Sequence, residues 1–306
     1  MPVRAFVPAD VPAWLGVVNP ALGRSTTPEQ LQAEDARASG LNLRWVFEDG
    51  GEVLGVARLN DFPFVPEGFL QAHVIVLPDE RGKGVGGKLT AVLREAVPDD
   101  VLGLSVSVRD NDPYSLEWAR QRGFQQVAHR FASELDLQAF DLRPFQTDFD
   151  RAAAQGVTFT TLEKASDATL ERYLNFHADR LMETPDLSGH ARWPLSQVRQ
   201  TLHLDDDPHP ERIFLALSPA GEWLGNTAVV AYGDMAYNEL TAIHPTARGR
   251  GLALPLKVQA IQAMQHAGFR IMRTNNHSRN APMIAVNRRL GFTQKSGAFE
   301  LHLLCR

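Results

Sequence analysis

One stretch of the sequence occurs twice: VLPDERGKGVG at residues 76–86 returns as IHPTARGRGLA at residues 243–253. The central arginines, Arg81 and Arg248, are 167 positions apart (248 − 81). Farther along, a Gly-Phe pair at residues 123–124 returns at residues 291–292, a separation of 168 (291 − 123). Because two separate landmarks keep nearly the same spacing, the sequence predicts two homologous domains of equal length and order.

Hydrophobic patterning around the two stretches predicts the same order of elements in each copy. In the first copy we expect strands at 3–6, 69–77, 102–108 and 127–137, a hairpin at 44–60, and helices at 8–18, 28–38, 84–96 and 113–122. In the second copy we expect strands at 157–162, 237–243, 270–274 and 300–304, a hairpin at 212–230, and helices at 167–182, 195–204, 251–266 and 281–289. The predicted domains are residues 1–144 and 156–306, joined by a connecting helix within 145–155.

Composition limits the class of protein. The chain has 306 residues, of which 44% are hydrophobic and 22% are charged, which is typical of a globular protein. Its net charge of −5 disfavours nucleic acid as a partner, because proteins that bind phosphate backbones are normally basic. The single cysteine, Cys305, excludes an internal disulfide and a multi-cysteine metal site, so no metal is expected. With no apolar stretch of membrane-spanning length and no recognisable leader, the sequence favours a cytoplasmic protein without a membrane partner.

Three phosphate-binding patterns compete for the glycine-rich turn of the first copy. Gly82, Gly84 and Gly87 match the dinucleotide motif G-x-G-x-x-G, but the second copy has Leu254 at the third glycine. A P-loop would need a Mg²⁺-binding hydroxyl where Leu89 stands, and it does not return in the second copy. The pattern common to both copies is Arg-x-x-Gly-x-Gly/Ala, after a strand that ends in Val/Ile-x-Pro and before a helix.

This shared pattern resembles the pyrophosphate-binding motif of the GNAT superfamily of coenzyme A-dependent N-acyltransferases, present here twice. The segment NAPMIAVNRRLGF, residues 280–292, resembles the second cofactor motif of that superfamily, N-x-x-M-x-x-x-N-x-x-L-G-F. The resemblance covers essentially the whole chain as a tandem pair, similar in plan to mycothiol synthase-like proteins. It implies an α/β (α+β) fold with two tandem GNAT-like domains, each a mostly antiparallel central sheet that splays open and is flanked by helices.

The resemblance also implies acetyl-coenzyme A as a substrate, with its pyrophosphate on the glycine-rich turns. Glycines let the backbone approach the phosphates, and the free amides at a helix N-terminus attract an anion. The arginines would add a charge-assisted contact. The expected cofactor-binding residues are Ile243, His244, Arg248, Gly249, Arg250, Gly251, Leu252, Ala253, Asn280 and Asn287 in the second copy, and Val76, Arg81, Gly82, Lys83, Gly84, Val85 and Gly86 in the first.

The strand before each turn lines the transfer site in the resembled family, and alternate strand residues share a face. In the second copy this pattern places on one face Tyr237, Glu239, Thr241 and Ile243. At a shift of 167 the equivalents in the first copy are all apolar, and Asp112 and Ala119 stand where the second motif has asparagines. We therefore expect the C-terminal domain to be catalytic and the N-terminal domain to be a vestigial or regulatory cofactor site.

The implied reaction is direct attack of a primary amine on the thioester in a ternary complex. Amines of pKa near 10 are mostly protonated at neutral pH, so a base must remove a proton. Glu239 is the candidate base and Tyr237 the second choice, whereas the alternative for Glu239 is a solvated strand carboxylate. The helix at 167–182 and the segment just after it carry four residues that could contribute to the acceptor pocket or to a surface ion-pair network: His177, Asp179, Arg180 and Glu183.

The predicted function is therefore an acetyl-coenzyme A-dependent N-acetyltransferase that acts on a primary amine of a small molecule. Two alternative enzyme activities are transfer of a longer acyl group from its coenzyme A ester and acylation of an amino-sugar or mycothiol-type acceptor. A third alternative is a non-catalytic sensor that binds acetyl-coenzyme A.

Overall fold

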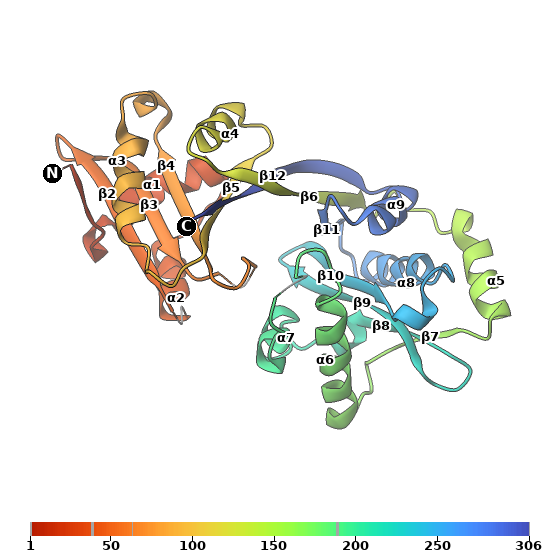
Figure 1. Cartoon of the computed structure of the whole chain (residues 1–306). Helices are drawn as coiled ribbons and strands as arrows, with labels where there is room; N and C mark the ends of the chain where they lie inside the picture. Colours follow the sequence, from red (N-terminus) through yellow and green to blue (C-terminus); the bar gives the residue numbers. More distant parts are fainter. Residues whose placement is uncertain (1, 38–39, 63, 188–189, 306) are drawn as a thin grey trace. The chain divides into compact units, whose positions relative to one another are not determined.

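The computed structural model describes residues 2–37, 40–62, 64–187 and 190–305. The chain forms two compact units: an N-terminal unit of Met1–Val127 with Phe299–Arg306, and a C-terminal unit of Ala128–Ala298 (Figure 1). Each unit has a mostly antiparallel sheet flanked by helices, which confirms the predicted fold class.

The sheet of the N-terminal unit has the strand order β1-β2-β3-β4-β5-β12. Its strands are β1 (Val3–Ala5), β2 (Asn42–Asp49), β3 (Glu52–Asn60), β4 (Phe69–Val76), β5 (Gly103–Arg109) and the end of β12 (Thr293–Leu304). Its helices are α1 (Val11–Leu22), α2 (Pro28–Arg37), α3 (Val85–Glu95) and α4 (Pro113–Arg120). The last residue expected in the second helix, 38, lies outside the described residues.

Two apolar cores cover the two faces of this sheet. On one face, Leu89 and Leu93 of α3 pack with Ala72 of β4 and Leu104 of β5. On the other face, α1 packs through residues such as Trp14 against the strands β2 and β3. Side chains alternate between the two faces along each strand, so every residue of β4 can be assigned to the α3 side or to the α1 side.

The sheet of the C-terminal unit has the order β12-β6-β11-β10-β9-β8-β7. Its strands are the start of β12, β6 (Gln125–Asp136, from Ala128), β7 (Thr158–Thr161), β8 (Ile213–Leu217), β9 (Trp223–Tyr232), β10 (Met235–Ile243) and β11 (Ile271–His277). Its helices are α5 (Gln146–Ala154), α6 (Asp167–Leu181), α7 (Leu195–Thr201), α8 (Ala253–His266) and α9 (Ala281–Arg289). Helix α5 lies where the connecting helix was expected.

The last strand of each sequence copy belongs to the unit formed by the other copy. Residues 128–136 of β6 lie in the C-terminal unit, and residues 299–304 of β12 lie in the N-terminal unit. The boundary predicted at 145–155 concerns the copies of the repeat and stays a prediction. It does not coincide with the limits of the compact units. Hydrophobic alternation predicts that a segment is a strand, but it does not say which sheet edge that strand will pair with.

Both sheets open next to the glycine-rich turn. In the N-terminal unit, β4 and β5 pair in parallel only from Phe69–Gly103 to Gln71–Ser105. In the C-terminal unit, β10 and β11 pair in parallel only from Met235–Ile271 to Tyr237–Arg273. Beyond three residue pairs the strands separate, as the predicted splayed sheet requires.

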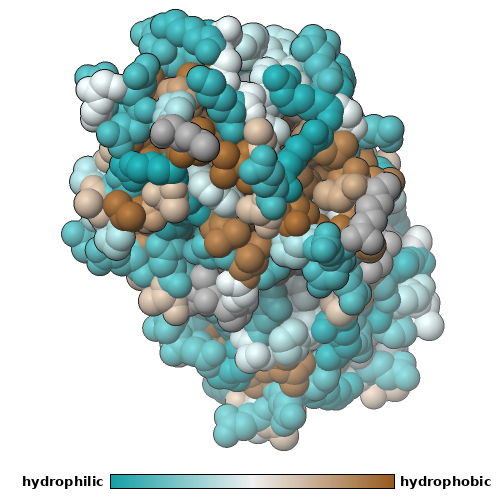
Figure 2. Space-filling model, turned by 60° about the vertical axis from the view of Figure 1, so that its left-hand side comes forward, coloured by the Kyte–Doolittle hydropathy of each residue, from teal (hydrophilic) through white to brown (hydrophobic). Residues whose placement is uncertain are grey.

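Apolar groups are visible on one face of the molecule (Figure 2). Polar side chains cover most of the face shown in Figure 2, and hydrophobic ones appear between them in separate groups. Over the described residues, the structure contains no helix with the length and apolar character needed to cross a membrane.

The exchange of the last strands predicts where a core mutation will act. Leu301 is fully buried in the core of the N-terminal unit although it belongs to the second sequence copy. Leu301→Ala should lower the free energy of unfolding of the N-terminal unit by about 2–5 kcal/mol. Native-state hydrogen exchange of the β4 and β5 amides would report this loss.

The matched control is Leu304→Ala, because Leu304 is 67% exposed on the same strand. It should change the same amides by less than about 0.5 kcal/mol. Faster exchange confined to β9 and β10 in Leu301→Ala would contradict the assignment of this strand to the N-terminal unit.

Candidate active site

The glycine-rich turn has the same backbone conformation in both units. Gly82 and Gly84 have φ of 80° and 86°, and Gly249 and Gly251 have φ of 77° and 79°. This left-handed conformation strains any residue that carries a Cβ, so it explains the glycines. A Cβ on Gly82, Gly84 or Gly249 would meet nothing within 4 Å, so the space in front of these glycines is open.

The arginine of each turn ties the turn to the strand before it. The Nε of Arg81 donates to the carbonyl of Val76 at 3.4 Å, and the Nε of Arg248 donates to the carbonyl of Ile243 at 3.3 Å. Arg248 also forms an ion pair with Glu183. Each turn is thereby held against the last residue of its strand, with a helix starting directly after it, at Val85 and Ala253.

Several residues expected to bind the cofactor have partners within the protein. The Nδ1 of His244 accepts from the amide of Thr246 at 3.4 Å, and the Nε of Arg250 donates to Gln155 at 2.8 Å. The side-chain oxygen of Asn280 caps α9 by accepting from the amide of Met283 at 3.4 Å. Asn287 is buried and donates to the Oδ1 of Asn276 at 2.7 Å. Contact of these residues with coenzyme A stays a prediction.

A β-bulge interrupts β10 at the candidate base. The pairing with β9 shifts between Asn238 and Leu240, so Glu239 has no partner in the ladder. Such an extra residue changes which later residues share a face. The four residues expected on one face are therefore split: Tyr237 lies on the α6 side, whereas Thr241 lies on the α8 side, where its hydroxyl donates to Asn238.

Glu239 is half-buried beside two tyrosines. Burial raises the pKa of its carboxyl to about 7. Burial also raises the pKa of Tyr237 and of Tyr232, and the Glu239 charge adds to both increases. The two tyrosine rings meet edge to face with centroids 5.8 Å apart. A carboxyl that titrates near neutral pH at the opening of the sheet has the properties of a general base.

The opening between β10 and β11 is crossed by a buried polar network on the α8 side. Asn238 donates to the hydroxyl of Thr227 at 2.9 Å and accepts from the Nζ of Lys257 on α8. The hydroxyl of Thr274 on β11 donates to the carbonyl of Asn238 at 3.0 Å. Lys257 is buried, and burial lowers the pKa of its amine to about 7. Sequence analysis did not identify this lysine, because it stands among the apolar residues of a core helix.

The expected acceptor helix α6 contributes ion pairs and one buried cluster. The Nδ1 of His177 is 2.9 Å from the hydroxyl of Tyr173, and Asn226 of β9 donates to the same hydroxyl at 3.1 Å. Farther along, Asp179 pairs with Arg192 at 2.7 Å. His177 therefore belongs to the interior of the unit, whereas Asp179 lies at its surface.

Strand β4 of the first copy has one polar face, which was not identified when its residues were aligned with those of β10 at a constant shift of 167. The third parallel pair is Gln71–Ser105 in the N-terminal unit and Tyr237–Arg273 in the C-terminal unit, so Gln71 of β4 is the equivalent of Tyr237. These two residues are 166 positions apart (237 − 71). The separation at the turn is 167, because β10 has an extra residue at its bulge and β4 has none. The apolar residues Ala72 and Val74 belong to the α3 side, and His73 belongs to the α1 side. The apolar residues expected to be equivalent to the candidate catalytic face lie on the α3 side, and the opposite face of β4 carries Gln71 and His73.

A cavity of about 420 Å³ lies beside the turn of the N-terminal unit. Residues 72–76 of β4 all line it, so it is bordered by both faces of this strand. The cavity also meets Gly82 and Gly84 of the turn and Arg109 of β5. It therefore runs from the glycine-rich turn on the α3 side, through the opening of the sheet, to the α1 side.

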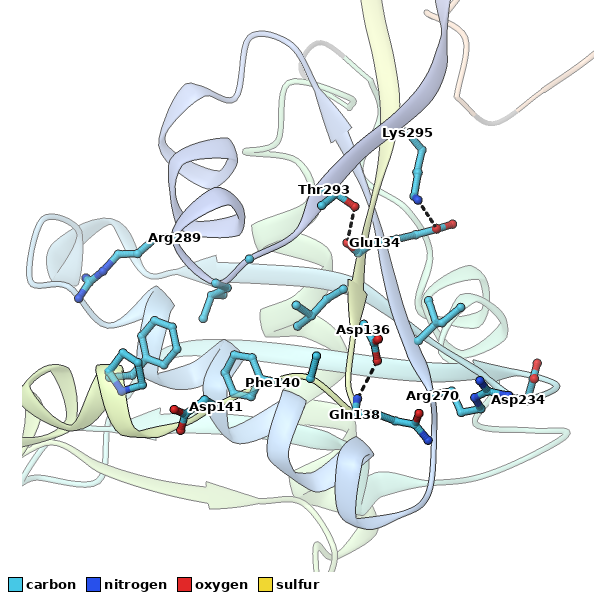
Figure 3. Close-up of a pocket in the computed structure, with 17 residues that line it drawn as sticks. Glu134, Asp136, Gln138, Phe140, Asp141, Asp234, Arg270, Arg289, Thr293 and Lys295 are labelled. Carbon is cyan, nitrogen blue, oxygen red and sulfur yellow. Dashed lines mark hydrogen bonds and ion pairs between the residues drawn. The ribbon is translucent and has the colours of Figure 1, made fainter.

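A second cavity, of about 870 Å³, lies in the C-terminal unit and was not anticipated from the sequence (Figure 3). It is lined by β6, β11, the segment before α5 and the start of β12, and includes no residue of the glycine-rich turn. Glu134 pairs with Lys295 at 3.3 Å, and Arg289 pairs with Asp148 at 2.6 Å. The charges of the cavity residues Glu134, Lys295 and Arg289 are thus neutralised by ion pairs.

Comparison with known proteins agrees with this geometry. The model of the acetyltransferase (GNAT) family matches residues 13–124. The chain is 34% identical over 150 residues to an L-methionine sulfoximine/L-methionine sulfone acetyltransferase of Pseudomonas paraeruginosa, covering 42% of this chain and 86% of the relative. It is 27% identical over 291 residues to a mycothiol acetyltransferase of Catenulispora acidiphila, covering 90% of this chain and 88% of the relative.

The chain belongs to the GNAT family of acetyltransferases. Solved structures support the same fold over nearly the whole chain. A GCN5-related N-acetyltransferase from Sphaerobacter thermophilus has a TM-score of 0.70 at 20% identity, covering 99% of this chain and 95% of that chain. A tandem GNAT protein from the clavulanic acid biosynthesis pathway has a TM-score of 0.66 at 21% identity, covering 99% and 98%. The predicted tandem GNAT architecture is confirmed.

The buried lysine predicts a pH dependence of stability. Between pH 7 and the ordinary lysine pKa of 10.5, the unfolded chain binds a proton at Lys257 that the folded chain does not. This lysine therefore makes the free energy of unfolding rise with pH in that window, by up to about 1.4 kcal/mol per pH unit. In Lys257→Met this contribution should disappear, so the unfolding curve of the variant rises less with pH.

Denaturant unfolding at several pH values between 7 and 10 would measure the difference in slope between the two chains. Lys88→Met, at an exposed lysine of α3, is the matched control. Parallel pH curves for the unmodified chain and Lys257→Met would contradict a buried amine with a lowered pKa.

Proposed function

We propose that this acetyltransferase transfers the acetyl group of acetyl-coenzyme A to a primary amine of a small molecule, and that the C-terminal copy carries out the transfer. The observation that supports this assignment most strongly is Glu239, a half-buried carboxyl with a pKa near 7 at the bulge of β10. Relatives named for mycothiol and for L-methionine sulfoximine support a small-molecule acceptor.

The turn of the C-terminal unit fits a pyrophosphate. Gly249 and Gly251 hold left-handed backbone with open space in front of Gly249, and the amides at the start of α8 follow directly. Backbone amides at a helix N-terminus suit an anion, because they are unpaired and lie at the positive end of the helix dipole. We propose that residues 248–253 hold the pyrophosphate.

Glu239 would then act on the amine. Its carboxylate removes a proton from the ammonium group, directly or through water, and the free amine attacks the thioester carbonyl. The new C–N bond forms and the C–S bond breaks, and the coenzyme A thiolate takes up the second proton that the nitrogen must lose to become an amide. Positioning the two substrates can supply about 7–11 kcal/mol, whereas a general base contributes about 10²–10⁴-fold. Removing the base should therefore slow the reaction without abolishing it.

Glu239→Gln tests this assignment. At neutral pH we expect kcat/KM to fall by roughly two orders of magnitude while the affinity for acetyl-coenzyme A stays nearly unchanged. In the unmodified enzyme kcat/KM should rise with pH through about 7, because Glu239 must be deprotonated to accept a proton. In Glu239→Gln that rise should vanish, leaving a partial recovery at high pH where more of the amine is already free.

Steady-state kinetics with a panel of amines and acyl-coenzyme A chain lengths would provide these values. Tyr237→Phe is the neighbouring control and should cost less. Full activity of Glu239→Gln across the pH range would contradict the assignment. An unmodified chain that binds acetyl-coenzyme A but acetylates no amine would favour a sensor instead.

A further inference from the structure

The side chains around the opening of the sheet differ between the two units. In the N-terminal unit, five of the residues that line the cavity of about 420 Å³ have small or apolar side chains: Ala72, Thr90, Val106, Val108 and Ala119. In the C-terminal unit, the five equivalent residues are buried and polar: Asn238, Lys257, Thr274, Asn276 and Asn287. The two openings therefore have the same backbone plan and different interiors.

The equivalences follow from the strand pairing and from the repeated stretches. The residues after the third parallel pair are Ala72 on β4 and Asn238 on β10, so these two correspond. The separation of 167 at the turns makes Lys257 the equivalent of Thr90. The parallel pairs and the Gly-Phe pairs both give a separation of 168 for β11 and α9 relative to β5 and α4.

Hydrogen bonds join the polar side chains of the C-terminal unit across its opening. The hydroxyl of Thr274 on β11 donates to the backbone carbonyl of Asn238 on β10 at 3.0 Å. The side-chain oxygen of Asn238 accepts in turn from the Nζ of Lys257 on α8. Both strands and the helix after the turn are thus connected at the place where the N-terminal unit has its cavity.

A second set of hydrogen bonds lies farther along β11. The side-chain amide of Asn287 on α9 donates to Asn276 at 2.7 Å, and the amide of Asn276 donates to the hydroxyl of Ser133 on β6 at 2.9 Å. The equivalent residues of the N-terminal unit, Val108 and Ala119, have no polar side-chain atoms with which to form such contacts. Polar side chains therefore fill the C-terminal opening along its length.

The C-terminal opening lies between the two parts of the proposed transfer site. Residues 248–253 lead into α8, whereas Glu239 lies next to the tyrosines on the α6 side of the sheet. In acetyl-coenzyme A a long flexible arm joins the pyrophosphate to the thioester. A molecule bound at the turn would therefore bring its thioester to Glu239 through the opening, where Lys257 and Asn238 occupy the path.

Lys257 can leave this path more easily than Asn238 can. The side-chain amide of Asn238 also donates to Thr227 and to the carbonyl of Ala228, at 2.9 Å each. Lys257 has a flexible four-carbon chain, and its amine contacts neutral groups, the oxygen of Asn238 and the ring of Phe292 at 5.1 Å from the centroid. Burial among neutral groups is unfavourable for an amine and lowers its pKa to about 7. Hydration regained in water would therefore offset the hydrogen bond that the amine gives up.

We infer that Lys257 controls entry to the C-terminal opening: its amine on Asn238 closes the path between the turn and Glu239, and its withdrawal admits the acetyl-bearing arm of acetyl-coenzyme A. The inference rests on the proposed binding of the pyrophosphate by residues 248–253. It assigns to Lys257 no part in proton transfer. Because Thr90 stands at this position in the N-terminal unit, the corresponding path there is open.

Lys257→Thr tests the inference, because it gives the C-terminal copy the residue of the N-terminal copy. All chains are full length and carry Gly84→Val, so that strain in the N-terminal turn restricts binding to the C-terminal one. Calorimetry compares acetyl-coenzyme A with ADP, which has a diphosphate and no arm. We expect Lys257→Thr to tighten the binding of acetyl-coenzyme A roughly 10-fold and to change the ADP affinity by less than about twofold.

Two further variants make the result specific. Lys164→Thr is the matched control, because it removes an exposed lysine of the same unit and should change neither affinity. The double variant Lys257→Thr/Asn238→Ala introduces both N-terminal residues and should bind acetyl-coenzyme A at least as tightly as Lys257→Thr. It provides a second reading if Lys257→Thr alone leaves Asn238 poorly packed and the chain unfolds.

Unchanged or weaker binding of acetyl-coenzyme A in both Lys257 variants would overturn the inference. An equal gain for ADP, or an equal gain in Lys164→Thr, would also overturn it. If neither probe binds to any of the chains, the proposed pyrophosphate turn fails and the inference fails with it. The base is tested separately, because Glu239→Gln should keep the gain in affinity, and a fully active Glu239→Gln chain would refute the base alone.

Discussion

Two parallel strands that pair for only three residues and then separate determine the geometry of both units. After the third pair, β4 leaves β5 and β10 leaves β11. The end of each first strand therefore faces an opening in the sheet, and the glycine-rich turn follows directly. In both copies the turn arginine donates its Nε to the last carbonyl of the strand, which fixes the turn at the opening. Glycines with positive φ follow at this opening, and a helix begins directly behind them.

The same opening is used differently in the two units. In the N-terminal unit a cavity of about 420 Å³ runs through it. In the C-terminal unit Asn238, Thr274 and Lys257 bridge it on the α8 side, while the bulge carries Glu239 next to the tyrosines on the α6 side. Burying an amine without an acidic partner costs stability. The difference between the units is thus one of polar side chains and of one inserted residue, on a shared backbone plan.

The sequence predicted the features that repeat and missed those that depend on single residues or on pairing partners. The repeated turns, the helices after them and the tandem GNAT plan follow from spacing and from positions that only glycine tolerates. The bulge at Glu239 could not be predicted, because one extra residue in a strand leaves no hydrophobic signal. Since a fixed shift of 167 ignores that residue, it aligns Tyr237 with Leu70, whereas the strand pairing makes Gln71 the equivalent of Tyr237. The exchanged last strands also escaped prediction, because alternation does not identify a partner edge.

The most direct measurement of the central claim is amine acetylation by two full-length variants, Gly251→Val and Gly84→Val. The two glycines have φ of 79° and 86°, and a Cβ at either position would meet no protein atom closer than 3.9 Å. The substitutions therefore impose comparable backbone strain on equivalent turns. If the C-terminal copy carries out the transfer, Gly251→Val should lose acetyl-coenzyme A turnover and Gly84→Val should retain most of it. Loss of turnover in Gly84→Val with activity preserved in Gly251→Val would contradict the account and move the transfer to the N-terminal unit.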